Sequence, residues 1–430
     1  MTHLALVRYL ALALPVAAVL GAARWTRPDR RRGGAALIGT VAAALGVLAL
    51  NVVAAAVHWW SFAPMDGSVL GTPVDLWLGW ALLWGGLPAL VRVPVPIVLA
   101  GFAWLDALTM PLLEPAVALG RWWLVGEAVG LVAVALPAML LGRWVADERH
   151  LAARATLQLV VFGGLVLWLA PAVAVDLSDG SWAPLTGLPR WALSLVVQVV
   201  ALVGLPGVLA VREFVERGNG TPWPWDPPRR LVTTGPYAYV ANPMQLSGVG
   251  LLAVAAAVTG SWTLLGAAGS AALFSAFIAG PHEHDDLTRR HGAAWAGYRA
   301  HVRTWWPRWR PYVGAPARLH LSVTCDVCDA TAVAVAGLRP VGLAIRPAEA
   351  HARRLRRARY EGPDGYHADG VAAVARGLEH VHLGWAAVGW ALRLPVLDRV
   401  FALIADGVGA GPRDLPAVRG SGAWATRGRS

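Results

Sequence analysis

The stretch Ala35–His58 reads AALIGTVAAALGVLALNVVAAAVH and contains no Asp, Glu, Lys or Arg. A helix needs about 20 apolar residues to cross the hydrocarbon core of a bilayer, so this stretch predicts a membrane-spanning helix. The whole chain shares its character, because 57% of the 430 residues are hydrophobic and 15% are charged. An average soluble protein has about 25% charged residues. The composition therefore excludes an ordinary soluble enzyme and a disordered chain.

Eight further segments resemble this stretch in length and composition. The first is expected to be a retained helix, since no clear signal-peptide cleavage site follows it. The sequence thus predicts an all-α multi-spanning membrane protein with about nine transmembrane helices and a small C-terminal α/β domain. The nine predicted spans are Leu4–Ala22, Ala35–His58, Pro73–Val91, Val93–Leu113, Trp122–Leu141, Ala155–Val175, Trp191–Val211, Met244–Gly260 and Trp262–Ala279.

Arginine is concentrated in every second loop, and cytoplasmic loops are typically enriched in basic residues. This alternation predicts a plasma-membrane protein with its N-terminus outside and its C-terminus in the cytoplasm. The net charge of +11 is attributed to topology and anionic lipid headgroups, with no nucleic acid as partner. The arginines follow the first, fifth and seventh spans, at Arg24, Arg27, Arg30, Arg31, Arg32, Arg143, Arg149, Arg154, Arg212, Arg217, Arg229 and Arg230.

Two motifs flank the last two predicted spans. The first is Arg229-Arg-Leu-Val-Thr-Thr-Gly-Pro-Tyr-Ala-Tyr-Val-Ala-Asn-Pro-Met244, and the second is His282-Glu-His-Asp-Asp-Leu-Thr-Arg-Arg-His-Gly-Ala-Ala-Trp-Ala-Gly-Tyr298. The chain thus has, in order, a basic loop, a Gly-Pro-Tyr turn, an Asn-Pro turn, a helical hairpin and an acidic helix start. Over about Gly218 to Pro311, this order resembles the isoprenylcysteine carboxyl methyltransferase and phospholipid methyltransferase superfamily. The segment Trp225-Asp-Pro-Pro-Arg-Arg-Leu-Val232 is typical of its bacterial members.

The resemblance implies a methyltransferase that uses S-adenosylmethionine on a lipid-like or membrane-partitioned acceptor. A zwitterionic donor must be met from water by loop backbone and by free amides at a helix start, and transfer then depends mainly on in-line positioning. The donor contacts carried over from the family fall on Arg229, Arg230, Leu231, Val232, Tyr237, Asn242, Pro243, Met244, Gln245 and Glu283.

The chain departs from the family pattern at several positions, and these departures disfavour prenylcysteine carboxyl methylation. They keep open a non-catalytic membrane scaffold or lipid-binding protein. The positions are Ala241 for an arginine, Gln245 for a tyrosine, His284 for the second glutamate, His291 for an aromatic residue and Ala279 for an arginine implicated in substrate handling.

Two of these features have simpler interpretations. Asn242-Pro243, taken alone, is usually a turn at a helix start. The run from His282 to Asp286 could hold a metal ion, but alternate residues do not share a helix face. We therefore interpret the run as an acidic helix N-terminus, with no metal predicted.

Both cysteines of the chain lie in Cys325-Asp-Val-Cys328, between the apolar runs Leu319–Val323 and Ala330–Leu338. Strand, Cys-x-x-Cys and helix in this order are typical of a thioredoxin-like redox domain, with Val341–Ile345 as the next strand. The region from about 317 to 415 resembles the DCC family of thiol–disulfide oxidoreductase-like proteins, although Ser322 and Val323 replace its usual Asp-Gly. Structural thiols and half of a zinc site are the alternatives.

The remaining predictions concern domain limits and the membrane region. We expect a seven-helix region at 1–211, a methyltransferase-like domain at 212–312, a thioredoxin-like domain at 317–415 and a disordered tail at 416–430. The oligomeric state stays open. Ionisable groups inside a membrane mark candidate sites, and in the first seven spans these are Asp75, Asp106, Glu114 and Glu127.

Overall fold

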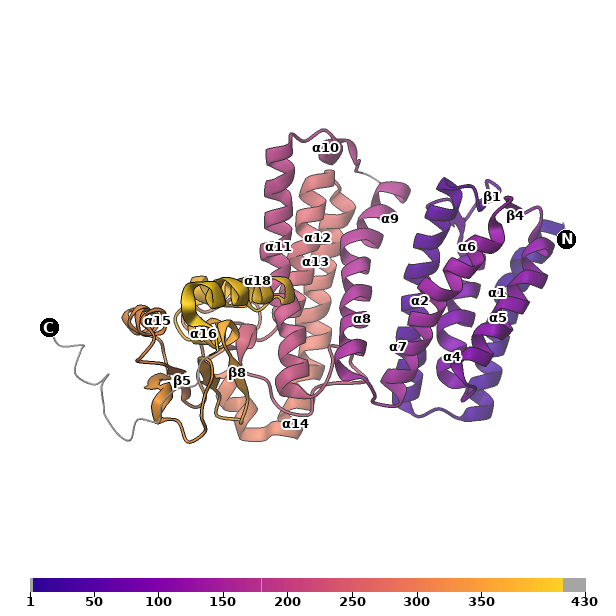
Figure 1. Ribbon diagram of the computed structural model, residues 1–430. Coiled ribbons are helices and arrows are strands. Elements are labelled where there is room, and N and C mark those ends of the chain that lie inside the picture. The colour runs from indigo at the N-terminus through magenta and orange to yellow at the C-terminus, as the bar shows by residue number, and fades with distance from the viewer. Residues whose placement is uncertain (1–2, 179, 413–430) are drawn as a thin grey trace. The chain divides into compact units, whose positions relative to one another are not determined.

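The computed structural model describes residues 3–178 and 180–412 (Figure 1). The tail predicted at 416–430 lies outside the described residues. The chain divides into two compact units, and each contains segments that are distant in sequence. Unit 1 comprises Met1–Ser194, Asn219–Arg229 and Leu251–Ser270, and unit 2 comprises Leu195–Gly218, Arg230–Gly250 and Ala271–Ser430.

Long apolar helices dominate the described chain. Seven of them are long and apolar enough to cross a membrane, which confirms a helical protein with several candidate spans. They are α1 (His3–Thr26), α2 (Arg30–Ala56), α5 with η2 (Val95–Leu113), α6 to α7 (Trp123–Ala146), α8 to α9 (Leu151–Leu177), α11 with η5 (Arg190–Gly218) and α13 to α14 (Trp262–Arg299).

The third and eighth predicted spans are also helical, but they are shorter. The third corresponds to α3 to α4 (Val74–Leu90), and the eighth to α12 (Pro243–Thr259), which has 17 residues. Both are shorter than the roughly 20 residues that a straight span needs. Length and composition thus support seven spans, and the predicted total of nine stays a prediction.

Two glycines let helices of unit 1 touch at the backbone. A Cβ atom on Gly85 in η1 (Leu82–Gly86) would lie 2.1 Å from the carbonyl oxygen of Gly39 in α2. A Cβ on Gly39 would lie 2.6 Å from the carbonyl oxygen of Gly85. Small residues permit such close approach of membrane helices. The neighbouring Ile38 and Trp84 are almost fully buried, so this contact lies in the core of unit 1.

We predict that Gly85→Ala lowers the thermal stability of the detergent-purified protein, because the added methyl group forces α2 and η1 apart. Overpacking of this kind costs about 1–3 kcal/mol. Gly101→Ala in α5 (Val95–Thr109) is the matched control, since nothing lies within 4 Å of the added Cβ there. Equal melting temperatures for the two variants would show that the glycine contact does not set the helix spacing.

Ion pairs bring three of the arginine-rich segments of unit 1 together. Arg31 at the start of α2 lies 2.9 Å from Glu148 and 3.3 Å from Asp226. Arg154 near the start of α8 (Leu151–Gly164) lies 2.8 Å from the same Asp226. Arg154 and Asp226 are both buried. The loops after the first and fifth helices therefore contact the Trp-Pro-rich segment Asn219–Arg229.

The intervening loops of unit 1 make contacts of their own. Strand β1 (Trp60–Phe62) pairs antiparallel with β4 (Val117–Leu119). The amide of Leu70 donates to the carboxylate of Asp176 at 2.8 Å. Alternate loops thus form two separate sets of contacts, one rich in arginine and one poor in it.

In unit 2, two helices follow the hairpin of α12 and α13 (Trp262–Phe274) without a break in the chain. The π-helical turn η7 (Ser275–Ala279) leads into α14 (Gly280–Arg299), which changes direction at Gly292 with φ +49°. The helical segment Trp262–Arg299 is continuous, so the acidic run that was predicted to begin a helix at His282 lies inside a helix, which is kinked at Gly292. Its Trp295 and Tyr298 are buried against Ala241 and Val302, which places α14 against the Asn-Pro turn.

The C-terminal region of unit 2 contains a four-stranded sheet in the order β6-β5-β7-β8. Strands β5 and β6 are parallel and flank α15, whereas β7 and β8 are antiparallel to their neighbours. The strand, Cys-x-x-Cys and helix order predicted from sequence is confirmed, with each strand displaced by two residues from its predicted range. The elements are β5 (Ala317–Leu321), α15 (Asp326–Gly337), β6 (Leu343–Pro347), β7 (Arg359–Glu361) and β8 (His367–Asp369).

Four helical elements complete this region. Leu319 and Leu321 of β5 are buried in one apolar cluster with Val335 of α15 and with Ala373 and Leu378 of α16. One face of the sheet is thereby covered by helices. The elements after β8 are α16 (Val371–Leu378), α17 (Leu383–Leu392), α18 (Pro395–Ala405) and η9 (Asp406–Ala410).

Candidate functional site

The Gly-Pro-Tyr turn of the predicted donor loop forms η6 (Gly235–Ala238) and packs against the end of α11 (Arg190–Glu213). The ring of Tyr237 is stacked on Phe214 with centroids 5.0 Å apart. Val232 and Met244 belong to the same apolar cluster. The structure therefore brings three predicted donor residues together, and it uses the side chains of Val232 and Met244 for packing.

The hydroxyl group of Tyr237 is the most informative atom of this loop. Tyr237 is 6% exposed, and its hydroxyl has no hydrogen-bond partner among the described residues. A buried polar group without a partner is costly. Burial raises the pKa of this phenol well above its usual value, and the nearby carboxylate of Glu283 raises it further. Glu283 lies in the first turn of α14, and its side chain is exposed.

The tyrosine is held by its backbone as well. The hydroxyl group of Tyr298 donates to the carbonyl oxygen of Tyr237 at 2.8 Å. Leu231 packs in the cluster that contains Trp295 and Tyr298. Because Tyr298 and Glu283 lie on the same helix α14, this bond fixes the loop relative to the helix that carries the predicted carboxylate.

The Asn-Pro turn begins α12, as predicted, with Pro243 as the first helical residue. The side-chain amide of Asn242 donates to Oε1 of Gln245 at 3.0 Å, and the hydroxyl of Ser275 donates to the same oxygen. Gln245 thus serves as a hydrogen-bond acceptor that links α12 to η7. The Asn242 side chain is engaged within its own turn.

The other predicted donor residues and family departures have different surroundings. Arg229 forms an ion pair with Glu148 in unit 1, and Arg230 is exposed. His284, which replaces the second glutamate, accepts a hydrogen bond on Nδ1 from the indole of Trp295 at 3.2 Å. This contact holds the two halves of kinked α14 together.

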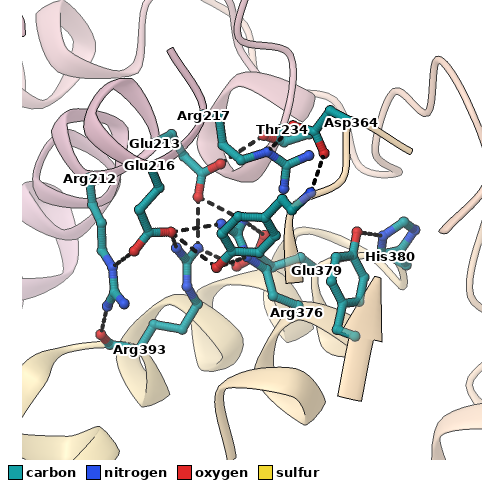
Figure 2. Close-up of polar contacts among 12 residues, drawn as sticks. Arg212, Glu213, Glu216, Arg217, Thr234, Asp364, Arg376, Glu379, His380 and Arg393 are labelled. Carbon is teal, nitrogen blue, oxygen red and sulfur yellow. Dashed lines mark hydrogen bonds and ion pairs between the residues drawn. The ribbon is translucent and has the colours of Figure 1, made fainter. Parts of the chain in front are cut away.

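A buried cluster of charged residues lies at the C-terminal end of α11, which the predicted topology places in the cytoplasm (Figure 2). The sequence patterns did not predict this cluster. Arg376 of α16 lies 2.6 Å from Glu213, and Arg393 after α17 lies 2.9 Å from the same carboxylate. Both arginines also contact Glu379, at 3.0 and 2.9 Å, and Glu216, at 3.2 and 2.9 Å. We call Glu213, Glu216, Arg376, Glu379 and Arg393 the α11 charge cluster.

The α11 charge cluster connects to the predicted donor loop. The hydroxyl of Thr234 donates to Glu213 at 2.7 Å, and that of Tyr239 donates to the carbonyl oxygen of Glu379 at 2.9 Å. Arg376, Arg393 and Glu213 are nearly inaccessible to solvent. Buried charges are tolerated when they are paired and hydrogen-bonded. The cluster therefore joins α11, the donor loop and the C-terminal helices into one polar network.

Arg217 extends this network toward the sheet. It pairs with Asp364 at 2.6 Å, and its guanidinium lies 4.4 Å from the ring centroid of Tyr366. A cavity of about 230 Å³ borders the network and is lined by Thr234, Tyr360, Glu379 and neighbouring residues. In the described part of the chain, Tyr237, Asn242 and Glu283 do not line this cavity, so it is distinct from the predicted donor contacts.

We predict that Arg393→Met strongly destabilises the contact between α11 and the C-terminal helices. Removing one partner of a buried ion pair costs about 3–5 kcal/mol, because the remaining charges stay buried. Hydrogen exchange of α16 and α17 in the detergent-purified protein measures this loss. Arg357→Met is the control, since Arg357 pairs with Asp406 in a more exposed contact. Unchanged exchange in Arg393→Met would show that the cluster does not hold these elements together.

The two cysteines lie at the N-terminus of α15, as predicted, and no disulfide links them in the structure. Cys325 is the N-cap residue, and its Sγ accepts a hydrogen bond from the amide of Cys328 at 3.4 Å. Cys325 is 3% exposed, and its Sγ lies 3.9 Å from the carbonyl oxygen of Gly409 in η9. The first thiol is thus the more buried of the two.

The loop before the cysteines is organised by Glu349. Its carboxylate accepts hydrogen bonds from the Ser322 hydroxyl at 2.6 Å and from the Val323 amide at 3.1 Å. Burial by itself would raise the pKa of Glu349, but these hydrogen bonds and one involving Thr324 lower it below its usual value. The positions where the DCC family has Asp-Gly are therefore held by a carboxylate from another segment.

The predicted intramembrane acids separate into paired and unpaired groups. Asp75 pairs with Arg8 at 2.5 Å, and Glu114 is exposed. Asp106 and Glu127 are buried and face one another. Neither oxygen of Asp106 has a hydrogen-bond partner among the described residues. Of the four acids, Asp106 and Glu127 are therefore the two that are buried within unit 1.

No protein-family model, curated protein or solved structure matches this chain.

Proposed function

We propose that this protein is an integral-membrane methyltransferase that uses S-adenosylmethionine. The observation that supports the proposal is the buried hydroxyl of Tyr237, which has no hydrogen-bond partner among the described residues and whose pKa is raised in part by the carboxylate of Glu283. These residues are predicted donor contacts from two motifs that flank a helical hairpin. A bound ligand with hydrogen-bonding groups would give the Tyr237 hydroxyl a partner. A cationic amino group on the same ligand would pair with the Glu283 carboxylate.

The residues of the loop and of α14 act by binding and positioning. Glu283 holds the amino group or ribose of the donor, and Tyr237 offers a hydrogen bond from a fixed ring. The free amides in the first turn of α12 meet the donor carboxylate. The bound donor supplies an activated methyl group on its sulfonium, so the protein needs to provide orientation more than acid–base chemistry.

The proposed acceptor is a lipid or another molecule that partitions into the membrane. Exposed apolar side chains on α13 and η7 lie just before Glu283 along the same helical segment, with Phe277 74% and Ile278 55% exposed. A hydrophobic acceptor could approach along this surface. The exposed Trp306 and Trp309, which neighbour several arginines, fit an interfacial position beside anionic headgroups.

We further propose nine spans in a bacterial plasma membrane, with the N-terminus outside and the C-terminus in the cytoplasm. Two observations support this topology. The shorter helices Val74–Leu90 and Pro243–Thr259 are apolar, and ion pairs join the arginine-rich loops that the topology places on one side.

Calorimetric titration of the detergent-purified protein with S-adenosylmethionine tests the donor site. We expect saturable binding, with Tyr237→Phe weakening it about tenfold, the loss that corresponds to one hydrogen bond of about 1.4 kcal/mol. Glu283→Gln should weaken it at least as much, because a charge-assisted contact is lost. Asp285→Asn is the control, since it removes a carboxylate from the same helix at a position that is not a predicted donor contact.

Two results would contradict the methyltransferase proposal. The first is absence of binding by folded wild-type protein, which would favour a scaffold or lipid-binding role. The second is binding that Tyr237→Phe and Glu283→Gln leave unchanged.

The cysteine pair supports a second candidate function, membrane-tethered thiol–disulfide exchange. The amide of Cys328 donates to Cys325 Sγ at the start of a helix that follows a strand, which is the layout of a thioredoxin-like redox motif. In this reaction the thiols of Cys325 and Cys328 form a disulfide, and two electrons and two protons pass to a disulfide of the partner, which becomes two thiols.

Equilibration of the protein with glutathione buffers tests this candidate. We expect a two-electron couple with one disulfide per chain, at a potential in the range of known redox domains, about −120 to −270 mV. Cys325→Ser and Cys328→Ser should each abolish it. A pair that stays reduced across this range would indicate structural thiols.

A further inference from the structure

The sheet of unit 2 brings together three metal-ligating side chains that are distant in sequence. His320 of β5 is opposite Arg359 of β7, so Glu361, two residues further along β7, lies diagonally beside His320 on the same face. His351 follows η8 (Ala348–Ala350) and reaches the same place from the loop after β6. The opposite face carries Leu319 and Leu321, which form the core.

The ligand atoms of these residues are close together. Nε2 of His351 lies 2.9 Å from Oε1 of Glu361, and Nε2 of His320 lies 3.4 Å from Oε2. One ligand atom from each residue can be chosen so that all lie within 4.8 Å of one another. Ligands of a tetrahedral zinc ion at about 2.1 Å are separated by roughly 3.4 Å, so small side-chain movements would complete the geometry.

His320 provides an independent indication of a ligand. It is 6% exposed, and neither ring nitrogen makes a hydrogen bond of good geometry within the described chain. Buried polar side chains nearly always have a partner. The unsatisfied imidazole faces the Glu361 carboxylate, so a cation held between them would satisfy both groups.

His351 has the surroundings of a metal ligand. Its Nδ1 lies 2.9 Å from the carbonyl oxygen of Arg353. A histidine that binds metal through one nitrogen usually donates its other N–H to a carbonyl or carboxylate, which fixes the tautomer and the ring. The amide of Arg353 lies 3.0 Å from the same Nδ1, and Nε2 lies 2.9 Å from Oε1 of Glu361. In the tautomer in which Nδ1–H donates to the Arg353 carbonyl, Nε2 can bind an ion held between His351 and Glu361.

We propose that His320, His351 and Glu361 bind a divalent transition metal ion of the zinc class. Two imidazoles and one carboxylate favour zinc over calcium or magnesium, which prefer oxygen ligands. Three protein ligands leave a fourth position for water or another molecule. Such an ion would join β5, β7 and the loop after β6. Its ligand His320 lies five residues before Cys325 in the chain.

Metal titration of the full-length, detergent-purified protein after chelator treatment tests the site. We expect one Zn²⁺ per chain, and one Co²⁺ with the visible spectrum of a four-coordinate nitrogen and oxygen site. Removing a residue that only hydrogen-bonds to a metal ligand typically lowers the affinity for the metal about 10–100-fold. His351→Gln and Glu361→Gln each remove a ligand itself, so they should lower the affinity for the metal by at least about 100-fold. His301→Gln is the control, since His301 is exposed outside the sheet.

The cysteines require a separate variant, because thiolates bind the same ions. Cys325→Ser with Cys328→Ser should keep both the stoichiometry and the cobalt spectrum. The proposal is overturned if wild-type protein binds no metal stoichiometrically, if binding survives in His351→Gln and Glu361→Gln, or if the spectrum shows sulfur-to-cobalt charge transfer that disappears with the cysteines. The cobalt spectrum of wild-type protein decides between these outcomes even where a variant fails to fold.

Discussion

The rest of unit 2 depends on the buried ion pairs between the last turns of α11 and the helices of the C-terminal region. Glu213 accepts contacts from Arg376 and Arg393 where solvent is excluded. Such pairs contribute little net free energy compared with apolar packing, but a single missing partner is strongly destabilising. They therefore act mainly as a specificity constraint, because few arrangements of α11, α16 and α17 satisfy all five charges.

Sequence patterns predicted the local structure well, and the reason is physical. Apolar runs such as Ala35–His58 become helices where they are long enough, and the short apolar run that begins at Leu319 falls in the strand Ala317–Leu321, two residues earlier than predicted. The α11 charge cluster could not be predicted, since Glu213 and Arg393 are 180 residues apart. A charged pair at the end of a span, as at Glu213 and Glu216, is the one signal that sequence offered.

The candidate site was predictable only in part. Tyr237 and Glu283 stay predicted donor contacts, and the structure joins the loop of Tyr237 to the helix of Glu283 through the hydroxyl of Tyr298. Val232 and Met244 are used for packing, and Asn242 bonds within its own turn. His320 and His351 looked scattered in sequence, yet strand register and one loop place them side by side. Contacts between distant residues decide such sites.

The helix α11 has a consequence for modularity. Its first residues belong to the predicted membrane region, and Glu213 and Glu216 lie at its C-terminal end. There the two carboxylates pair with Arg376 and Arg393 of the C-terminal region. A chain truncated after Pro311 would leave these two carboxylates without their countercharges and Tyr239 without its acceptor on Glu379. The C-terminal region is therefore part of the folding unit of this membrane protein. It cannot be removed or replaced by another domain without leaving these groups unpaired.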